Sequence, residues 1–264
     1  MVKNGPFALV FHTLVVIFML APMVVVCLVA FTPENTLSMP WNGFSLRWFE
    51  AVFAHADFMT SFGTSIKLAI ASATISTLLA VPSALAIAQY EFRGREALNA
   101  LFLSPLIIPS LVLGVAFLRL FSLLGFTGSF GWLVAAHVIV VTPYALRLIL
   151  ASLSGMDRNA ENAARTLGAD EWTVFRRVTL PLLLPGLTGG WLLAFINSFD
   201  ELTMSIFVTS PATVTLPVRM YMYASESIDP MMAAVSALMI LVAAVTMLVI
   251  DRLFGLDRLL VGKG

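Results

Sequence analysis

The chain has 264 residues, of which 59% are hydrophobic and only 11% are charged, and its mean hydropathy is +0.95. Soluble globular domains carry about 45–50% apolar and about 25% charged residues, so this composition excludes an ordinary soluble domain and indicates an integral membrane protein. The formal net charge is zero, so no overall field attracts nucleic acid or an anionic surface.

The first apolar segment covers residues 8–31. It is longer than the h-region of a cleaved signal peptide, about 7–15 residues, and Lys3 gives only a weak positive start. The single cysteine, Cys27, follows Val26, where a lipoprotein cleavage site needs a small residue. We therefore predict a retained transmembrane helix, and no disulfide or cysteine-cluster metal site. Residues 1–60 are expected to hold this helix and an outer segment, whose aromatic residues suit the membrane interface: Trp41, Phe44, Trp48 and Phe49.

Five further apolar stretches make up a predicted five-helix core over residues 61–264. They cover residues 62–90, 97–124, 130–154, 180–208 and 231–253. A spanning helix needs about 20 mostly apolar residues, so we predict an all-α integral membrane fold with six transmembrane helices. In a bundle, neighbouring helices satisfy the carbonyls that a proline frees, so we expect kinks and no breaks. The prolines for which we expect this lie inside the predicted spans: Pro22, Pro82, Pro105, Pro109, Pro143 and Pro185. A small-residue patch suits close helix packing: Gly186, Thr188, Gly189 and Gly190.

Basic residues set the predicted orientation. With the N-terminus in the cytoplasm, ten fall on the cytoplasmic side: Lys3, Arg93, Arg95, Arg158, Arg165, Arg176, Arg177, Arg252, Arg258 and Lys263. Only Arg47 and Arg219 fall outside. Three more, Lys67, Arg119 and Arg147, lie near helix ends, where long side chains reach the interface. This asymmetry predicts a multi-pass membrane protein with both termini in the cytoplasm.

The cytoplasmic loop over residues 155–179 carries the most informative pattern. Asp157 can cap a short helix, and Gly168 suits the left-handed position that follows its end. Asp170 can begin a second helix with Arg176 and Arg177 in its last turn, as the helix dipole favours. We predict two short helices that meet at a sharp angle and present a surface lined by alanine and glycine. One face of the second helix is apolar: Trp172, Phe175 and Val178.

This loop resembles the coupling motif of binding-protein-dependent ABC importer permeases. That motif runs Glu-Ala-Ala, three residues, Gly, nine residues and then Ile-x-Leu-Pro. The matching positions are Ala163, Ala164, Gly168, Val178, Leu180 and Pro181. Asn162 stands at the Glu position, directly after Glu161, so a salt bridge of the family's Glu is not carried over. The resemblance implies a MetI-like permease with these ATPase-coupling residues: Glu161, Asn162, Ala163, Ala164, Gly168, Ala169 and Pro181.

The resemblance runs from about Ser61 to the C-terminus. Residues 198–221, SFDELTMSIFVTSPATVTLPVRMY, resemble the second permease subunit of the spermidine/putrescine branch, although ferric iron and aminoethylphosphonate branches share much of this region. The resemblance implies a location in the bacterial inner membrane. The implied partners are a homologous second permease, two ATPase subunits that hold ATP and Mg, a periplasmic substrate-binding protein and the lipid bilayer. The chain itself is expected to be no enzyme and to hold no cofactor or metal. Its only Gly-Lys pair, Gly262-Lys263, has Asp257 where a P-loop needs glycine.

Two acids, Asp200 and Glu201, fall inside the predicted fifth span, where a carboxylate costs roughly 2.5–3.5 kcal/mol. One interpretation is a cation site on the substrate path, and the other is an ion pair with the partner subunit or with one of Lys67, Arg119 and Arg147. Four residues at a spacing of four would form one polar stripe: Asn197, Glu201, Ser205 and Thr209. Asp200 lies about 100° away, so Glu201 is favoured for the path.

A lone histidine, His137, lies in the middle of the fourth span and is expected to be a hydrogen-bonded packing residue. A secondary transporter or channel without an ATPase is the rival hypothesis; it predicts internal repeats and no cytoplasmic docking helices, and the coupling motif argues against it. An intramembrane enzyme would need convergent His, Asp, Glu or Ser residues, which the sequence does not offer. The favoured hypothesis is a permease subunit of an ATP-driven importer, with polyamines as the first substrate class.

Overall fold

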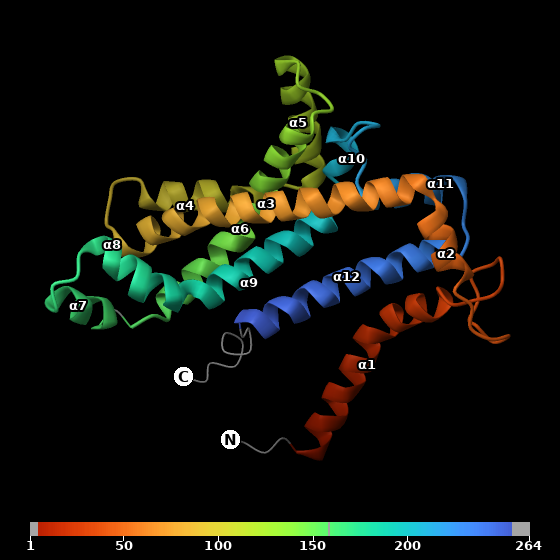
Figure 1. The fold of residues 1–264 in the computed structure, drawn as a ribbon, viewed down its shortest axis with the longest axis horizontal. Helices are drawn as coiled ribbons and strands as arrows, with labels where there is room; N and C mark the ends of the chain where they lie inside the picture. The colour runs from red at the N-terminus through yellow and green to blue at the C-terminus, as the bar shows by residue number, and fades with distance from the viewer. Residues whose placement is uncertain (1–4, 158, 255–264) are drawn as a thin grey trace. The chain divides into compact units, whose positions relative to one another are not determined.

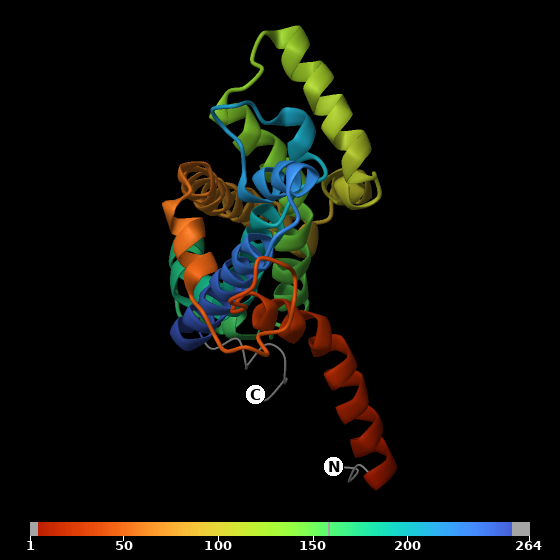
Figure 2. The same cartoon turned by 90° about the vertical axis from the view of Figure 1, so that its right-hand side faces the viewer.

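A computed structural model describes residues 5–157 and 159–254 of the chain (Figures 1 and 2). Within these ranges the regular structure is helical, which confirms the all-α prediction. Four of the predicted cytoplasmic basic residues lie outside the described ranges: Lys3, Arg158, Arg258 and Lys263. The same holds for Asp257 and Gly262.

Five described helices are long and apolar enough to span a membrane, and the number is six if a bent helix pair forms one span. The long helices are α1 (Pro6–Val29), α3 (Ala56–Gln89), α6 (Phe130–Ser154), α9 (Leu180–Phe199, preceded by further helical turns from Glu171) and α12 (Met231–Phe254). The pair consists of α4 (Arg95–Leu103) and α5 (Ser110–Leu124). The six predicted segments are all present, and the differences lie at two breaks.

The first break falls at Pro105 and Pro109, where the prediction of a kink was wrong. The helical turn Ser104–Leu106 continues α4, and α5 then leaves at an angle of 100° (Figure 1). Two prolines four residues apart remove two N–H donors from adjacent turns and disfavour helical backbone in the residue before each. The single prolines Pro22, Pro82, Pro143 and Pro185 do not break their helices, as predicted.

The second break ends α9 at Phe199, whereas the sequence predicted a helix to residue 208. Residues 200–204 form a non-helical segment, here called the corner, and the short helix α10 (Ser205–Val208) follows it. A Cβ atom on Gly114 of α5 would lie 2.7 Å from Phe207 and 3.1 Å from the Met204 backbone, so α5 packs directly against α10. Asp200 and Glu201 therefore lie at the end of a helix and not in its middle.

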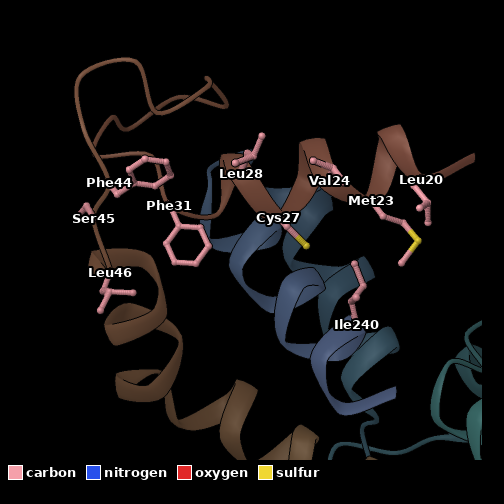
Figure 3. Close-up of a pocket in the computed structure, with 10 residues that line it drawn as sticks. All are labelled: Leu20, Met23, Val24, Cys27, Leu28, Phe31, Phe44, Ser45, Leu46 and Ile240. Atoms are coloured by element: carbon pink, nitrogen blue, oxygen red, sulfur yellow. The ribbon is translucent and has the colours of Figure 1, made fainter. Parts of the chain in front are cut away.

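The chain divides into two compact units. One joins the chain up to Thr60 with Arg219–Ala243, and the other joins Ser61–Val218 with the chain from Ala244. The first unit contains α1, α2 (Arg47–Ala54), α11 (Leu216–Glu226) from Arg219 onward, and α12 up to Ala243. An apolar groove of about 630 Å³ in this unit is lined by α1, by residues 44–46 and by Ile240 of α12, and Cys27 lies among its apolar side chains (Figure 3).

The second unit is built on the close contact of α6 with α9, which run side by side (Figure 1). A Cβ atom on Gly186 would overlap the Ser152 Cβ, and one on Gly190 would lie 3.1 Å from the Ala145 Cα. The predicted role of the small-residue patch is confirmed, because only hydrogen at these positions lets the two backbones approach so closely. Ala80 and Ala84 of α3 complete the apolar cluster around Ala145.

Candidate functional site

The 155–179 loop contains the helix α7 (Asn159–Thr166), which begins and ends as predicted. Asp157 Oδ1 accepts a hydrogen bond from the Asn159 N–H at 2.9 Å, which caps the start. Gly168 has φ +87°. The Ala169 N–H donates to the Ala164 carbonyl at 3.1 Å, and the Gly168 N–H donates to the Arg165 carbonyl at 2.9 Å. These two bonds form a Schellman motif, which confirms Gly168 as the left-handed residue after the helix.

The second helix of the loop begins as predicted but does not end. Asp170 precedes α8 (Glu171–Val174), and its Oδ1 accepts the Thr173 hydroxyl at 2.5 Å, a bond that holds the pKa of the Asp170 carboxyl below its usual range. A π-helical segment, Phe175–Thr179, then joins α8 to α9 without a break. The prediction of a separate short helix ending at Arg177 was wrong. Pro181 offers no N–H to the Arg177 carbonyl, and a wider π-helical turn accommodates that loss.

Glu161 is a buried residue of the loop that connects its two helical parts. It is 4% exposed, and its carboxylate accepts the Thr179 hydroxyl at 2.5 Å. Arg165 makes a bidentate pair with Glu171, with Nε–Oε1 at 2.9 Å and Nη2–Oε2 at 3.0 Å, and its Nη1 lies 4.0 Å from Glu161. These contacts fix α7 against α8 and the π-helical segment. Sequence reasoning missed this bracing role, although the spacing of four between Glu161 and Arg165 was visible.

The outer surface of the loop is partly apolar. Leu167 is 89% exposed and Trp172 is 65% exposed. Of the predicted coupling residues, Asn162, Ala163, Gly168 and Pro181 are exposed, Ala164 and Ala169 are half-buried, and Glu161 is buried. Large apolar side chains beside small exposed residues are typical of a surface that packs against another protein.

The corner holds both acids but not the predicted polar stripe. Asp200 is exposed, and Glu201 is half-buried with its Oε1 accepting the Met204 N–H at 2.6 Å. Because the helix ends at Phe199, Glu201 and Ser205 do not continue the helix face that carries Asn197. Asn197 instead donates to the Leu193 carbonyl at 2.8 Å. The four predicted path residues therefore do not share one helix face, and Ser205 is buried and bonded to His137.

Neither corner acid forms an ion pair within residues 5–157 and 159–254. Lys67, Arg119 and Arg147 are all exposed and none lies within salt-bridge distance of Asp200 or Glu201. Of the structural alternatives considered for the acids, pairing with these three basic residues is therefore wrong. Two adjacent carboxylates without a cationic partner in the described chain are chemically suited to bind a cation.

His137 is fully buried in α6 and hydrogen-bonded at both ring nitrogens. Nδ1 lies 2.9 Å from the Ser198 Oγ, and Nε2 lies 3.0 Å from the Ser205 Oγ. The prediction of a hydrogen-bonded packing residue is confirmed. Its two partners lie on either side of the corner, which sequence reasoning did not anticipate because it treated residues 198–205 as one helix.

Residues 76–256 match the family described as the binding-protein-dependent transport system inner membrane component. The chain belongs to this family. The permease is 30% identical, over 243 residues, to the spermidine/putrescine transport system permease protein PotC of Haemophilus influenzae, an alignment that covers 92% of this chain and 94% of PotC. It is 36% identical over 230 residues to the molybdenum transport system permease protein ModB of Mycobacterium bovis, covering 80% of this chain and 87% of ModB.

Solved structures support the same fold. A bacterial ABC transporter involved in the import of the acidic polysaccharide alginate contains a chain that matches with a TM-score of 0.68 at 16% identity, covering 96% of the permease and 98% of that chain. The MetI-like permease fold predicted from the coupling motif is therefore confirmed. Both the loop and the corner lie inside the residues that match the family.

Proposed function

We propose that this permease forms half of the translocation path of an ATP-driven importer for polyamines. The observation that carries the proposal is the corner, where Asp200 and Glu201 present two adjacent carboxylates without a cationic partner in the described chain. The similarity to PotC supports the same substrate class. A polyamine carries several ammonium groups that lose water in a narrow path, and charge-assisted hydrogen bonds to carboxylates offset part of that loss.

The proposed machinery is the one that the coupling motif implied. A homologous second permease completes the path, a periplasmic binding protein delivers the substrate, and two ATPase subunits hold ATP and Mg. The permease itself holds no cofactor and catalyses no reaction. The exposed side chains of Leu167 and Trp172, beside the Schellman turn at Gly168, form the surface we assign to ATPase docking. ATPase closure would draw two such loops together and open the path outward in alternating access.

An oxyanion importer is the second candidate, because ModB is 36% identical to this chain. An anionic substrate would meet like charge at the corner, where repulsion and carboxylate desolvation act together against binding. Ferric iron and aminoethylphosphonate remain alternatives from the same family of transporters. The charge of the preferred substrate separates the polyamines from the oxyanion.

The test uses the assembled importer in membrane vesicles and measures uptake of labelled putrescine and spermidine. Glu201→Gln keeps the shape of the side chain and an acceptor for the Met204 N–H, while it removes the charge. Since a hydrogen bond to a charged group contributes about 1.5–3 kcal/mol, we expect uptake to fall about tenfold or more. Asp200→Asn is the companion variant, and Glu96→Gln, an exposed acid in the first turn of α4, is the matched control.

Permease abundance and ATPase co-purification are expected to stay within about twofold of the unmodified protein. Normal uptake in both Glu201→Gln and Asp200→Asn would refute a cation path at the corner. Loss of both variants from the membrane would show that the acids serve folding. Molybdate uptake that is unchanged or faster in Glu201→Gln, with no polyamine uptake in the unmodified importer, would favour the oxyanion candidate.

A further inference from the structure

Three buried polar side chains bridge the two ends of the corner. His137 of α6 contacts the Ser198 Oγ at 2.9 Å through Nδ1 and the Ser205 Oγ at 3.0 Å through Nε2. Ser198 lies in the last turn of α9, and Ser205 is the first residue of α10. Asp200 and Glu201 lie in the chain between these two serines, so one imidazole ring connects the segments on both sides of the acids.

The bridge is sealed from solvent. Ser198 is 3% exposed, and His137 and Ser205 are both 0% exposed. Around them, Ala136, Val138, Met204 and Val208 belong to one buried apolar cluster. Breaking a hydrogen bond in such surroundings is strongly unfavourable, because no water replaces the lost partner. The imidazole is rigid and planar, and its two nitrogens point apart, so it fixes the separation of the two hydroxyls.

Glu201 is tied to the same segment from its other side. Its carboxylate accepts the N–H of Met204, the residue immediately before Ser205, at 2.6 Å. The position of the carboxylate therefore depends on where Met204 and Ser205 sit relative to the end of α9. That relation is what the Ser198–His137–Ser205 bridge sets.

We propose that His137 is a positioning residue for the substrate path, which holds the Asp200–Glu201 corner in place through Ser198 and Ser205. This inference rests on the proposed function, because it assigns to the bridge the placement of the acids that bind the substrate. His137 does not contact the substrate in this scheme. It acts by limiting the positions that the Glu201 carboxylate can take, which lowers the ordering cost of cation binding.

The first variant is His137→Phe. It keeps an aromatic ring of similar size and removes both ring nitrogens, so Ser198 and Ser205 lose their hydrogen bonds to this side chain. Thr142→Val is the matched control, because Thr142 is also buried in α6 and its hydroxyl donates to the Val138 carbonyl of the same helix, at 2.6 Å. In the assembled importer we expect polyamine uptake by His137→Phe to fall about tenfold, with a raised KM and near-normal abundance, and Thr142→Val to transport within about twofold of normal. Hydrogen exchange of the peptide covering residues 199–208 should be about tenfold faster in His137→Phe and unchanged in Thr142→Val.

A double-mutant cycle with Glu201→Gln identifies the route of the effect. If His137 acts through the corner, the double variant His137→Phe/Glu201→Gln should transport no worse than Glu201→Gln alone. Multiplying losses, about a hundredfold in total, would show that His137 acts elsewhere and would overturn the inference. Normal uptake by His137→Phe beside impaired Glu201→Gln would overturn this inference alone, whereas normal uptake by Glu201→Gln would overturn the proposed function.

Ser198→Ala keeps the test valid if His137→Phe does not accumulate in the membrane. This variant leaves the imidazole and its bond to Ser205 and removes only the link to α9. We expect a smaller loss of uptake, about threefold, together with faster exchange over residues 199–208. Unchanged exchange and uptake in an abundant Ser198→Ala protein would show that the bridge does not hold the corner.

Discussion

At the scale of the residue, Gly168 has the strictest backbone requirement in the 155–179 loop. Its φ of +87° lies in the left-handed region, and two Schellman hydrogen bonds depend on that conformation. A Cβ atom at Gly168 would meet nothing within 4 Å, so a substitution there strains the backbone and adds bulk to the exposed surface without a clash inside the permease. The effects on the turn and on docking are therefore separable.

Gly168→Ala should cost about 1 kcal/mol in the loop through backbone strain, and Gly168→Asp should add bulk and charge at the surface assigned to docking. We expect reduced ATPase co-purification and uptake in both, with the larger loss in the Asp variant. Gly155→Ala is the control, because Gly155 has φ −88°, which any residue can adopt. Full transport and normal assembly in both Gly168 variants would contradict the assignment of the loop.

Single residues also show where sequence reasoning stopped. Asp157 and Gly168 were predicted correctly because capping and left-handed turns depend on neighbours within a few positions. Glu161 was not recognised as buried because its partner, Thr179, lies 18 residues away, on the far side of the turn. His137 bonds to serines 61 and 68 residues away, and only the folded chain reveals such pairs.

At the scale of the element, the positions of the spans followed from hydropathy and their interruptions did not. Apolar residues continue beyond the corner into α10, and residues 200–204 contain neither glycine nor proline, so composition gave no signal that α9 ends at Phe199. The break between α4 and α5 did carry a signal, Pro105 and Pro109. Whether two prolines only kink a helix or break it depends on which groups of the folded bundle can bond to the freed carbonyls, and the sequence does not show which groups lie nearby.

The contact of α6 with α9 gives the prediction at this scale. Gly186→Ala places a Cβ atom that overlaps the Ser152 Cβ, and a change of rotamer moves neither Cβ, so the two helices must separate. Overpacking of this kind costs about 1–3 kcal/mol, and we expect lower abundance and a lower melting temperature of the purified permease. Gly63→Ala in α3, with no atom within 4 Å of the new Cβ, should be neutral or stabilising.

A second substitution should rescue the first. Ser152→Gly removes the atom that the new Cβ at position 186 would meet, so Gly186→Ala/Ser152→Gly should recover most of the abundance lost in Gly186→Ala. The 3.1 Å approach to the Leu148 carbonyl persists in the double variant and limits the recovery. If Ser152→Gly makes the defect worse, the contact is not what Gly186→Ala disturbs.

At the scale of the whole molecule, the bent pair α4–α5 decides the membrane topology. Arg93 precedes this pair and Arg95 is its first residue, whereas Arg165, Arg176 and Arg177 follow α6. Both groups lie on one side of the membrane only if α4–α5 and α6 each cross it. A re-entrant α4–α5 that returned to its own side would place the 155–179 loop outside, against the positive-inside rule and away from any cytoplasmic ATPase.

Reporters that are active only in the cytoplasm test this directly. Fused after residue 45 and after residue 127, in the turn between α5 and α6, they should be silent; fused after residue 157 and at the C-terminus, they should be active. The reporter after residue 127 decides between the two topologies, since a re-entrant pair leaves that turn in the cytoplasm and an actual crossing places it outside. Activity at that position, or a silent C-terminus, would contradict six spans with both termini in the cytoplasm. Activity after residue 127 would also place the 155–179 loop outside, where it could not reach a cytoplasmic ATPase.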